Sequence, residues 1–597
     1  MVKKCISVII MTVMILSMTA GCNSPVAFDI SGNNTAIDIN GSAYKEAENN
    51  ASNTPFGAYP DTIYYTLGKM TSDNNSNMPK GDTYEDNVYT RYIKDTINVQ
   101  NVDAFEAEDG QYDTKVSMAV AMKDIPDIMV VSNPDTLSLL IENDMIEDLS
   151  ESYQKCLSPK IKSMYESYGD ELLSQVTFDG KIMALPETNI TDGPNLLWLR
   201  KDWMDKLGLK KPENISDAVN IIKAFVENGM GDNENGNTVG LVCDTSIAGE
   251  CGYSSEYLLD IIFASFDAYP KQWLKEDDGS ITYGSVTDNA KQALAYIHEL
   301  YEENVIDNNF LLRTTANIIE LIENGQCGSF FGPWWAPNNP LIKAVGYDSE
   351  ADWQPYLLQT DSQGRTSYHS QNPCYKYIVV RKGYEHPELA AKIVSVLFDK
   401  MRYECNTSKE LKQYYQLSVE PTARPLSINI DYKNALNMCY QELCDVINNE
   451  KQPSSLNIME SSYYDACISY LYNSGGVNQS INGSVSDRNV AGRKGATSDQ
   501  WAAYMSRIKA CSVLSSANIN VVNSVFFGST YTMKSRWWRL KEEEKQVYIR
   551  IICGEGSIDE FDQFVSYWYQ NGGTQITDEV SEKVSDCLLY TSDAADD

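Results

Sequence analysis

The sequence predicts an α/β fold, because short apolar runs of strand length alternate along it with amphipathic segments of helix length. The composition agrees with a folded chain: of 597 residues, 43% are hydrophobic and 22% are charged, which is ordinary for globular proteins and excludes general disorder. This length suits two large lobes, or three to four units of about 150 residues each.

The charge and the rare residue types exclude several function classes. The chain has 48 basic and 83 acidic residues, a net charge of −35, and such a surface repels phosphate backbones, so we expect no nucleic-acid partner. With three histidines and no zinc-type histidine spacing, nucleophile elbow, phosphate loop or dinucleotide fingerprint, the sequence offers no catalytic motif. Paired carboxylates stay open, because so many acids allow many pairs.

The N-terminal region is typical of an exported lipoprotein. Residues 1–22 have a basic start and an apolar stretch over residues 5–18, which predicts a signal peptide too short to span a membrane. Their ending, Thr19-Ala20-Gly21-Cys22, resembles a bacterial lipobox, in which Cys22 carries acyl chains such as palmitate; ordinary secretion is the alternative. Residues 23–55 read as a flexible tether. We therefore expect a lipid anchor on the extracellular side of the cell membrane.

The other end of the chain and the cysteines need separate treatment. Residues 587–597 match a reading frame through a sequencing adapter, so we exclude them from fold reasoning. Of 14 cysteines, three lie in the leader, the anchor and the adapter, which leaves an odd number without a CxxC pair. Free thiols in an exported protein suggest a reducing habitat, although Cys243 and Cys251 are close enough in sequence for a disulfide.

The first part of the mature chain reads as a βαβ series. Its loops at the carboxyl ends of strands are where open α/β sheets bind ligands. The expected strands are 63–67, 97–105 and 128–131, and the expected helices are 84–95, 113–123 and 136–143.

The remainder continues the alternation and then becomes rich in helices and tyrosines. A polar loop interrupts the last third at about residues 479–499. The expected elements are a turn and strand at 178–186, a strand running into a helix at 196–203, helices at 216–227, 289–303 and 316–324, a strand at 377–380 and a helix at 387–400.

Seven segments occur in an order that is familiar from one protein family. They are Ala121–Asp127, Asp179–Pro186, Trp198–Gly208, Tyr301–Asp307, Gly332–Trp335, Gly554–Asp562 and Gly572–Val580. Together they resemble the carbohydrate-type extracellular solute-binding lipoproteins of bacterial ABC importers, which form binding-protein family 1, and within it the LplA-like branch. The resemblance covers nearly all of residues 57–586.

The resemblance implies a two-lobed fold of the periplasmic-binding-protein type II, with discontinuous lobes joined by a hinge. Crossovers between the lobes are expected just after Pro186 and near residues 370 and 430. The N-lobe would comprise 56–187 and 370–430, and the C-lobe 188–369 and 431–586 with a helix-rich C-terminal extension. Ligand would be held in the cleft between them, with hinge closure on binding.

Two adjacent tryptophans are the first candidate ligand-binding residues. Trp334 and Trp335 follow a Gly-Pro turn, and indole faces pack well on the flat C–H faces of sugar rings. The family resemblance places this turn at the cleft. We expect at least one of the two to touch ligand, and the other can belong to the core.

Candidates in the N-lobe follow its strands. Tyr65 and Lys69 belong to the first strand and its loop, which the family geometry places at the cleft mouth; strand packing is the alternative for Tyr65. Ser132, Asn133 and Asp135 follow the strand at 128–131, where short polar side chains can bond sugar hydroxyls. The alternative is a helix cap, because Asn-Pro-Asp is a good helix start.

The expected hinge supplies the last candidates. Glu187 and Asn189 follow the first crossover, where an acid or an amide can reach both lobes, although a solvated loop is the simpler interpretation. Asn372 and Tyr375 lie at the second crossover, where residues would line the cleft floor.

The family often carries a calcium loop, and the corresponding stretch here is Gly231–Gly240. Asp232 and Glu234 are out of register for such a loop, and the trailing acid is missing. We therefore expect no cofactor, with calcium as the minority alternative.

The resemblance implies a binding protein without chemistry of its own. It would act as a lipid-anchored monomer that captures an oligosaccharide or related solute and delivers it to the permease subunits of an ABC importer. Two alternatives stay open: a secreted lipoprotein glycoside hydrolase that uses two carboxylates, and a peptide-binding or adhesin member of the same scaffold.

Overall fold

The computed structural model describes residues 41–71, 78–190, 193–251, 256–416, 420–474 and 492–593. Cys22 and most of the expected tether lie outside these ranges. The chain forms two compact units, residues 1–46 and 47–597, and helix α1 (Ser42–Ser52) crosses their boundary. The architecture below is that of the second unit. Among the described residues, no helix combines the length and the hydropathy that a membrane crossing requires.

The first lobe is built on a five-stranded mixed sheet with the strand order β2-β1-β3-β13-β6. The first three strands along the chain are parallel, whereas β13 runs antiparallel to both β3 and β6. The strands are β1 (Ile63–Thr71), β2 (Val99–Glu108), β3 (Ile128–Val131), β6 (Leu185–Pro186) and β13 (Tyr377–Val380). The N-lobe is therefore completed by a strand that lies far along the chain.

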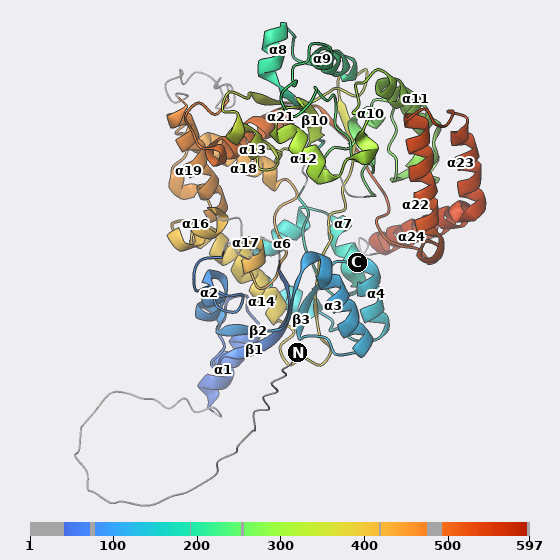
Figure 1. Cartoon of the computed structure of the whole chain (residues 1–597). Helices are drawn as coiled ribbons and strands as arrows, with labels where there is room; N and C mark the ends of the chain where they lie inside the picture. Colours follow the sequence, from blue (N-terminus) through green and yellow to red (C-terminus); the bar gives the residue numbers. More distant parts are fainter. Residues whose placement is uncertain are drawn as a thin grey trace, which may run out of the picture. The chain divides into compact units, whose positions relative to one another are not determined.

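Helices cover both faces of this sheet, with α2 and α14 on one side and α3 and α4 on the other (Figure 1). All four residues of β3, Ile-Met-Val-Val, are buried, as expected for a central strand with both faces covered. The other elements of this lobe are α2 (Val88–Ile97), α3 (Asp109–Met122), α4 (Pro134–Glu142), α5 (Ser150–Cys156), α6 (Pro159–Glu166), α7 (Asp170–Leu173), η2 (Ser174–Val176), β4 (Thr177–Phe178), β5 (Lys181–Ile182), α14 (Leu389–Ser395), η5 (Val396–Met401), α15 (Arg402–Glu404), α16 (Lys409–Gln416) and α17 (Glu420–Ala423).

The second lobe contains a three-stranded antiparallel sheet of order β10-β7-β11, in which Gly332 pairs with Leu196. Side-chain caps start its helices: Asn214, Thr287 and Thr314 each accept a hydrogen bond from the first turn. The elements are β7 (Leu196–Arg200), α8 (Lys201–Leu207), α9 (Ile215–Glu227), α10 (Asp260–Ala264), β8 (Trp273–Lys275), β9 (Ile281–Tyr283), η3 (Gly284–Val286), α11 (Asp288–Glu302), η4 (Phe310–Leu312), α12 (Thr315–Glu323), β10 (Ser329–Gly332), α13 (Leu341–Tyr347) and β11 (Trp353–Tyr356).

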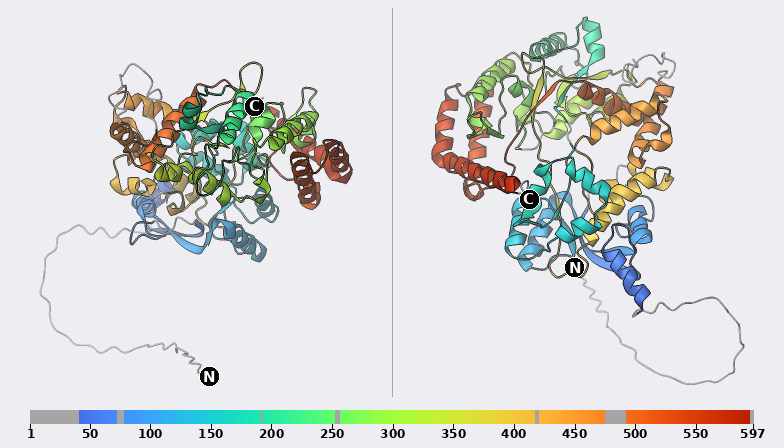
Figure 2. Two further views of the ribbon diagram at one scale, coloured as in Figure 1. Left: turned by 45° about the horizontal axis from the view of Figure 1, so that its top comes forward. Right: turned by 180° about the vertical axis from the view of Figure 1, so that it is seen from behind.

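The C-terminal third is helical and completes the second lobe, which has two hydrophobic cores. One core takes residues from α22–α24 and the other from α18–α21, and Figure 2 shows α22–α24 grouped together. These elements are α18 (Ala435–Ile447), η6 (Pro453–Ser455), α19 (Ile458–Asn473), α20 (Ser498–Tyr504), η9 (Met505–Ala510), α21 (Cys511–Ser515), α22 (Tyr531–Ile552), α23 (Glu560–Trp568), η10 (Tyr569–Gly573) and α24 (Thr574–Asp593), with β12 (Thr366–His369) parallel to β14 (Ile519–Val522).

The α/β prediction is confirmed, and the expected N-terminal strands occur as β1, β2 and β3. Their starts differ from the predicted ones by two residues at most. The eleven cysteines from Cys156 to Cys553 are all free thiols, so Cys243 and Cys251 are not bridged. Helix α24 continues to Asp593 and so runs into the segment 587–597 that the sequence analysis set aside.

Candidate functional site

Three chain segments run side by side where the two lobes join. The amide of Glu187 donates to the carbonyl of Lys376 at 2.7 Å, and the amide of Thr188 donates to the carbonyl of Asn429 at 2.9 Å. The amide of Asn189 then returns to the second segment and donates to the carbonyl of Pro373 at 2.8 Å. The first segment therefore lies between the other two, and we call these three segments the hinge.

Glu187 sits at the centre of the hinge. Its Oε1 accepts from the amide of Asn429 at 3.3 Å, and its Oε2 lies 4.0 Å from Nζ of Lys376. This Oε2 is buried and has no hydrogen-bond partner among the described residues. Burial raises the pKa of Glu187, and Lys376 and the Asn429 amide oppose that rise. The hinge thus holds a buried carboxylate oxygen that lacks a hydrogen-bond partner among the described residues.

The side chains of the two predicted hinge amides are both hydrogen-bonded within the protein. Nδ2 of Asn189 donates to the carbonyl of Asn372 at 3.0 Å. Oδ1 of Asn372 accepts from the amide of Cys374 at 3.2 Å and from Nε2 of Gln175 at 3.1 Å. Tyr375 is partly exposed beside them. The structure therefore brings all four predicted hinge residues together, and both amides already have partners within the protein.

The two tryptophans lie at the end of β10, next to the start of β7, which leaves the hinge. The pairing of Gly332 with Leu196 fixes this position, and Nε1 of Trp198 donates to the carbonyl of Pro333 at 3.2 Å. Trp334 is only 6% exposed and belongs to the core, whereas Trp335 is partly exposed. Of the pair, Trp335 is the ring that solvent can reach.

An arginine that the sequence analysis did not single out lies against Trp334. The guanidinium carbon of Arg507 is 4.4 Å from the ring centre of Trp334 and 3.9 Å from that of Tyr463. Its Nη2 donates to the hydroxyl of Tyr463 at 2.7 Å. No motif marks Arg507 or Tyr463; the only signal was the tyrosine-rich composition of the last third.

Two of the predicted residues lie inside the N-lobe. Tyr65 is 2% exposed and Lys69 is fully buried. Nζ of Lys69 donates to the carbonyls of Thr422 and Arg424 and to the hydroxyl of Ser427, at 2.5, 2.6 and 3.3 Å. Neither side chain is accessible to a solute in this structure, because both are buried. The ammonium group of Lys69 also directs its hydrogen bonds to groups within the lobe.

The three candidates after β3 form a helix start. Oδ1 of Asn133 accepts from the amide of Asp135 at 2.8 Å and caps α4, while Ser132 donates to a carboxylate oxygen of Asp113. Asp135 forms an ion pair with Lys534 at 3.5 Å. That pair joins α4 of the N-lobe to α22 of the C-lobe. Helix capping, which the sequence analysis left open, accounts for Asn133.

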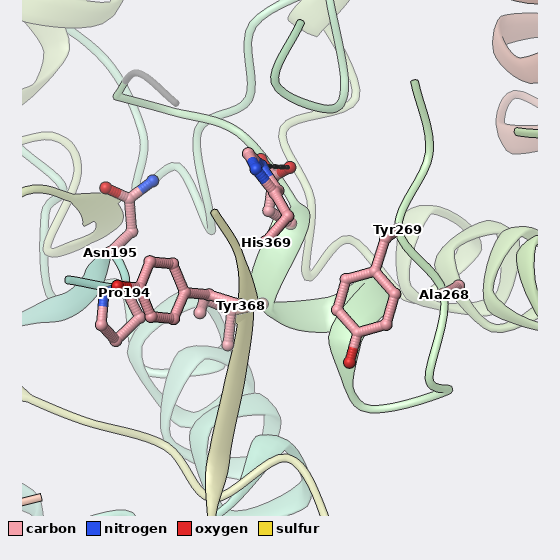
Figure 3. A pocket seen from close by; sticks show the side chains of 8 residues that line it. Pro194, Asn195, Ala268, Tyr269, Tyr368 and His369 are labelled. Atoms are coloured by element: carbon pink, nitrogen blue, oxygen red, sulfur yellow. Dashed lines mark ion pairs between the residues drawn. The ribbon is translucent and has the colours of Figure 1, made fainter. Parts of the chain in front are cut away.

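A small cavity lies between the chain that leaves the hinge and the chain that returns to it (Figure 3). It encloses about 20 Å³, room for one water molecule. Nε2 of His369 lies 3.5 Å from Oδ1 of Asp260, the pair joined by the dashed line. The other lining residues are Pro194, Asn195, Ile261, Ala268, Tyr269 and Tyr368.

A larger polar groove of about 740 Å³ lies elsewhere on the C-lobe. Its walls come from the start of α9, the end of α10 and residues 359–367, where Asp361 and Arg365 pair at 2.6 Å. None of its lining residues belongs to the hinge.

Side-chain oxygens in the stretch 231–240 accept hydrogen bonds from other residues of the same stretch. Oδ1 of Asp232 accepts from the amide and the hydroxyl of Thr238, at 2.7 and 3.0 Å, and Oδ1 of Asn233 accepts from the amide of Asn235 at 2.8 Å. In the described part of the chain, no three His, Cys, Asp or Glu side chains gather as a metal site.

Comparison with known families gives one match that covers more than half of the chain. The model described as bacterial extracellular solute-binding protein matches residues 75–401.

Two relatives of known function share limited identity. The chain is 22% identical over 247 residues to the polygalacturonan/rhamnogalacturonan-binding protein YtcQ of Bacillus subtilis, covering 40% of this chain and 46% of YtcQ. It is 24% identical over 234 residues to the fructooligosaccharide ABC transporter substrate-binding protein FusA of Streptococcus pneumoniae, covering 37% of this chain and 41% of FusA. The chain thus spans less than half the length of both relatives.

The fold is similar over a longer range. The structure of FusA in complex with kestose superposes with a TM-score of 0.56 at 14% identity, covering 88% of this chain and all of that one. At this identity the likeness shows the fold: a two-lobed solute-binding-protein fold with a helical extension.

Proposed function

Because the chain belongs to the bacterial extracellular solute-binding protein family, we propose that it captures an oligosaccharide or a related solute between its two lobes. It would deliver this solute to the permease subunits of an ABC importer. The names of two relatives, a polygalacturonan/rhamnogalacturonan-binding protein and a fructooligosaccharide-binding protein, support a carbohydrate. The family consists of binding proteins rather than enzymes.

The hinge is the observation that carries this proposal. Three segments joined by backbone hydrogen bonds connect two lobes with separate cores. Rotation about a few backbone dihedrals can therefore bring the lobes together while the hydrophobic cores of each lobe stay intact. A solute that contacts both lobes binds the closed form better and so shifts the population towards it.

We propose that residues of the C-lobe and of the hinge contact the solute. Trp335 offers a partly exposed ring at the C-lobe side, and Glu187 has a carboxylate oxygen at the hinge that lacks a hydrogen-bond partner among the described residues. A carboxylate can accept hydrogen bonds from vicinal sugar hydroxyls. Asn189, Asn372 and Tyr375 would line the floor beside Glu187.

Anchoring is part of the proposal and rests on the sequence. The lipobox-like ending of residues 1–22 would place an acylated Cys22 in the membrane, with the residues from 23 up to helix α1 as the tether. This tether is shorter than the predicted 23–55, because residues 42–52 form α1 and Ala51 is buried in the N-lobe core. We propose that the protein works there as a monomer facing the outside of the cell, with lobes of the extent given in the sequence analysis.

A thermal-shift screen of the purified protein against plant, host-glycan and bacterial oligosaccharides tests this function. A ligand at a hundredfold excess over Kd adds about 2.7 kcal/mol of stability. We expect a shift with one glycan series, an unchanged sugar by chromatography, and loss of the shift in Trp335→Ala. The matched control is Trp538→Ala, which removes a ring that is 66% exposed on α22.

Three results would contradict the proposal. Products on the chromatogram would indicate a hydrolase. A shift with peptides alone would indicate a peptide-binding protein, and retention on an immobilised polymer without affinity for any small oligomer would indicate an adhesin.

A further inference from the structure

We propose that Arg507 binds a carboxylate of the solute, so that the cargo is an acidic oligosaccharide that contains uronic acid residues. This inference rests on the proposed function and narrows it. It starts from a cation that, among the residues the structure describes, has no carboxylate partner although the chain is strongly acidic.

Arg507 belongs to a group of helices in the C-lobe that approaches the chain on the C-lobe side of the hinge. It lies on η9, a π-helical turn, and such turns occur often at functional sites. Helix α21, which follows η9, approaches the chain that leaves the hinge: a Cβ on Gly193 would lie 3.3 Å from Leu514. Helix α18, which packs on η9 and α21, begins only six residues after Asn429 of the hinge.

The charge of Arg507 is not balanced within the protein. Its only hydrogen bond to another described residue goes from Nη2 to the hydroxyl of Tyr463, and its Nε is buried without a partner. Burial disfavours the charge, and the groups that favour it are Tyr463, Cys439 and Cys511. Burial raises the pKa of Cys439 to about 12, so that thiol is neutral at pH 7.

Three other buried or half-buried arginines in the described chain have carboxylate partners. Arg200 pairs with Asp202 at 2.7 Å, Arg313 with Asp307 at 2.7 Å, and Arg402 with Asp431 at 3.0 Å. When a largely buried guanidinium lacks such a partner, no ion pair offsets the free-energy cost of removing its charge from water. An anion supplied from outside would give Arg507 the kind of partner that these three arginines obtain from the protein.

The surroundings also fix the orientation of the guanidinium. Trp334 and Tyr463 lie 4.4 and 3.9 Å from its carbon, so the group is held between two aromatic rings. A planar fork that is already oriented loses little entropy when it binds a carboxylate. Arg507 remains partly exposed, so a bound solute can reach it.

The decisive experiment compares sugars that differ only in their carboxylates. Isothermal titration of the wild-type protein would use oligouronates of the galacturonate, mannuronate and guluronate types, each paired with its carboxyl-reduced neutral counterpart. We expect at least one acid to bind at least tenfold more tightly than its neutral counterpart, with an affinity that falls as salt rises.

Variants then assign that preference to Arg507. We expect Arg507→Gln to lower affinity for the acid at least tenfold and to bring it close to that for the neutral sugar. Arg507→Lys should retain part of the preference, because it keeps the charge and loses the fork. Arg539→Gln removes an exposed arginine of α22 and should leave both affinities unchanged.

Each outcome decides the matter. Equal affinity of the wild type for acid and neutral sugars, or binding of neutral sugars alone, overturns the inference and leaves the proposed function standing. An acid preference that survives in Arg507→Gln also overturns it and makes Arg507 a support for Trp334. Failure of every oligosaccharide to bind overturns the proposed function itself. If Arg507→Gln does not fold, the wild-type comparison and Arg507→Lys still decide.

Discussion

The ammonium group of Lys69 donates a hydrogen bond to the carbonyl oxygen of Arg424 at 2.6 Å, across 355 positions of the sequence. Through this contact strand β1 is tied to the segment that leads into the third part of the hinge. Burial lowers the pKa of Lys69 to about 7, an effect that Asp103 partly opposes. Lys69 therefore links the N-lobe sheet to the hinge in a way that depends on pH.

We predict that Lys69→Met destabilises the protein more at pH 9 than at pH 6. The unfolded chain holds this proton up to about pH 10.4, while the folded chain releases it near 7, so the contribution of Lys69 to stability rises across that range. Urea unfolding at both pH values should show a difference of about 1–3 kcal/mol between the two mutational losses. Lys94→Met, at an exposed site, should show none, and a pH-independent loss for Lys69→Met would contradict the prediction.

The contribution of Glu460 to stability should change with pH in the opposite direction to that of Lys69. Burial raises its pKa to about 7, so its contribution to stability is fully present at low pH, below its unfolded pKa, and is lost as pH rises through 7. We expect Glu460→Gln to gain about 1–3 kcal/mol over the wild type at pH 8 and little at pH 5. The amide oxygen can still accept from the amide of Asn457, as the carboxylate does at 2.9 Å. Equal effects at both pH values would show that burial does not govern this group.

The two adjacent tryptophans should separate under mutation. Trp334 is a core residue at 6% exposure, so Trp334→Ala should cost about 3–5 kcal/mol of unfolding free energy. Trp335→Ala should cost clearly less in the same urea titration, because its ring already meets solvent, and its main effect should fall on solute affinity. Equal stability losses would place both rings in the core.

The ion pair of Arg402 and Asp431 should hold the third hinge segment. Both residues are largely buried, and Nη1 of Arg402 donates to Asp431 at 3.0 Å and to the carbonyl of Ile430 at 2.9 Å. Arg402→Met strands a buried carboxylate and should cost about 3–5 kcal/mol. Adding Asp431→Asn should recover part of that loss. A double-mutant cycle measures the coupling, and strict additivity would mean that the two charges act independently.

Much of the fold could be predicted from local sequence patterns. The buried run Ile128–Val131 and the capped segment starting at Asn133 are readable from neighbouring residues alone, and both occur as predicted. The division into two lobes could be predicted only from the family resemblance, because β13 joins a sheet whose other strands lie mostly within residues 63–131. No periodicity along the chain indicates such a distant pairing.

The site was less accessible to sequence reasoning. The burial of Lys69 depends on carbonyl groups more than 350 residues away, and a polar residue after a strand reads the same whether it turns inward or outward. Arg507 carries no motif, and it lies on a π-helical turn, where the 3.6-residue period that would assign it to a helix face is interrupted.

The discontinuous lobes have a consequence for how the protein is made. The N-lobe core draws on residues as far along as Ile430 and Ile458, and one C-lobe core is not complete before Val580. Domains otherwise tend to fold in the order in which they leave the ribosome. Here neither core can be completed until most of the chain has been synthesised, so neither lobe can reach its native packing early in synthesis.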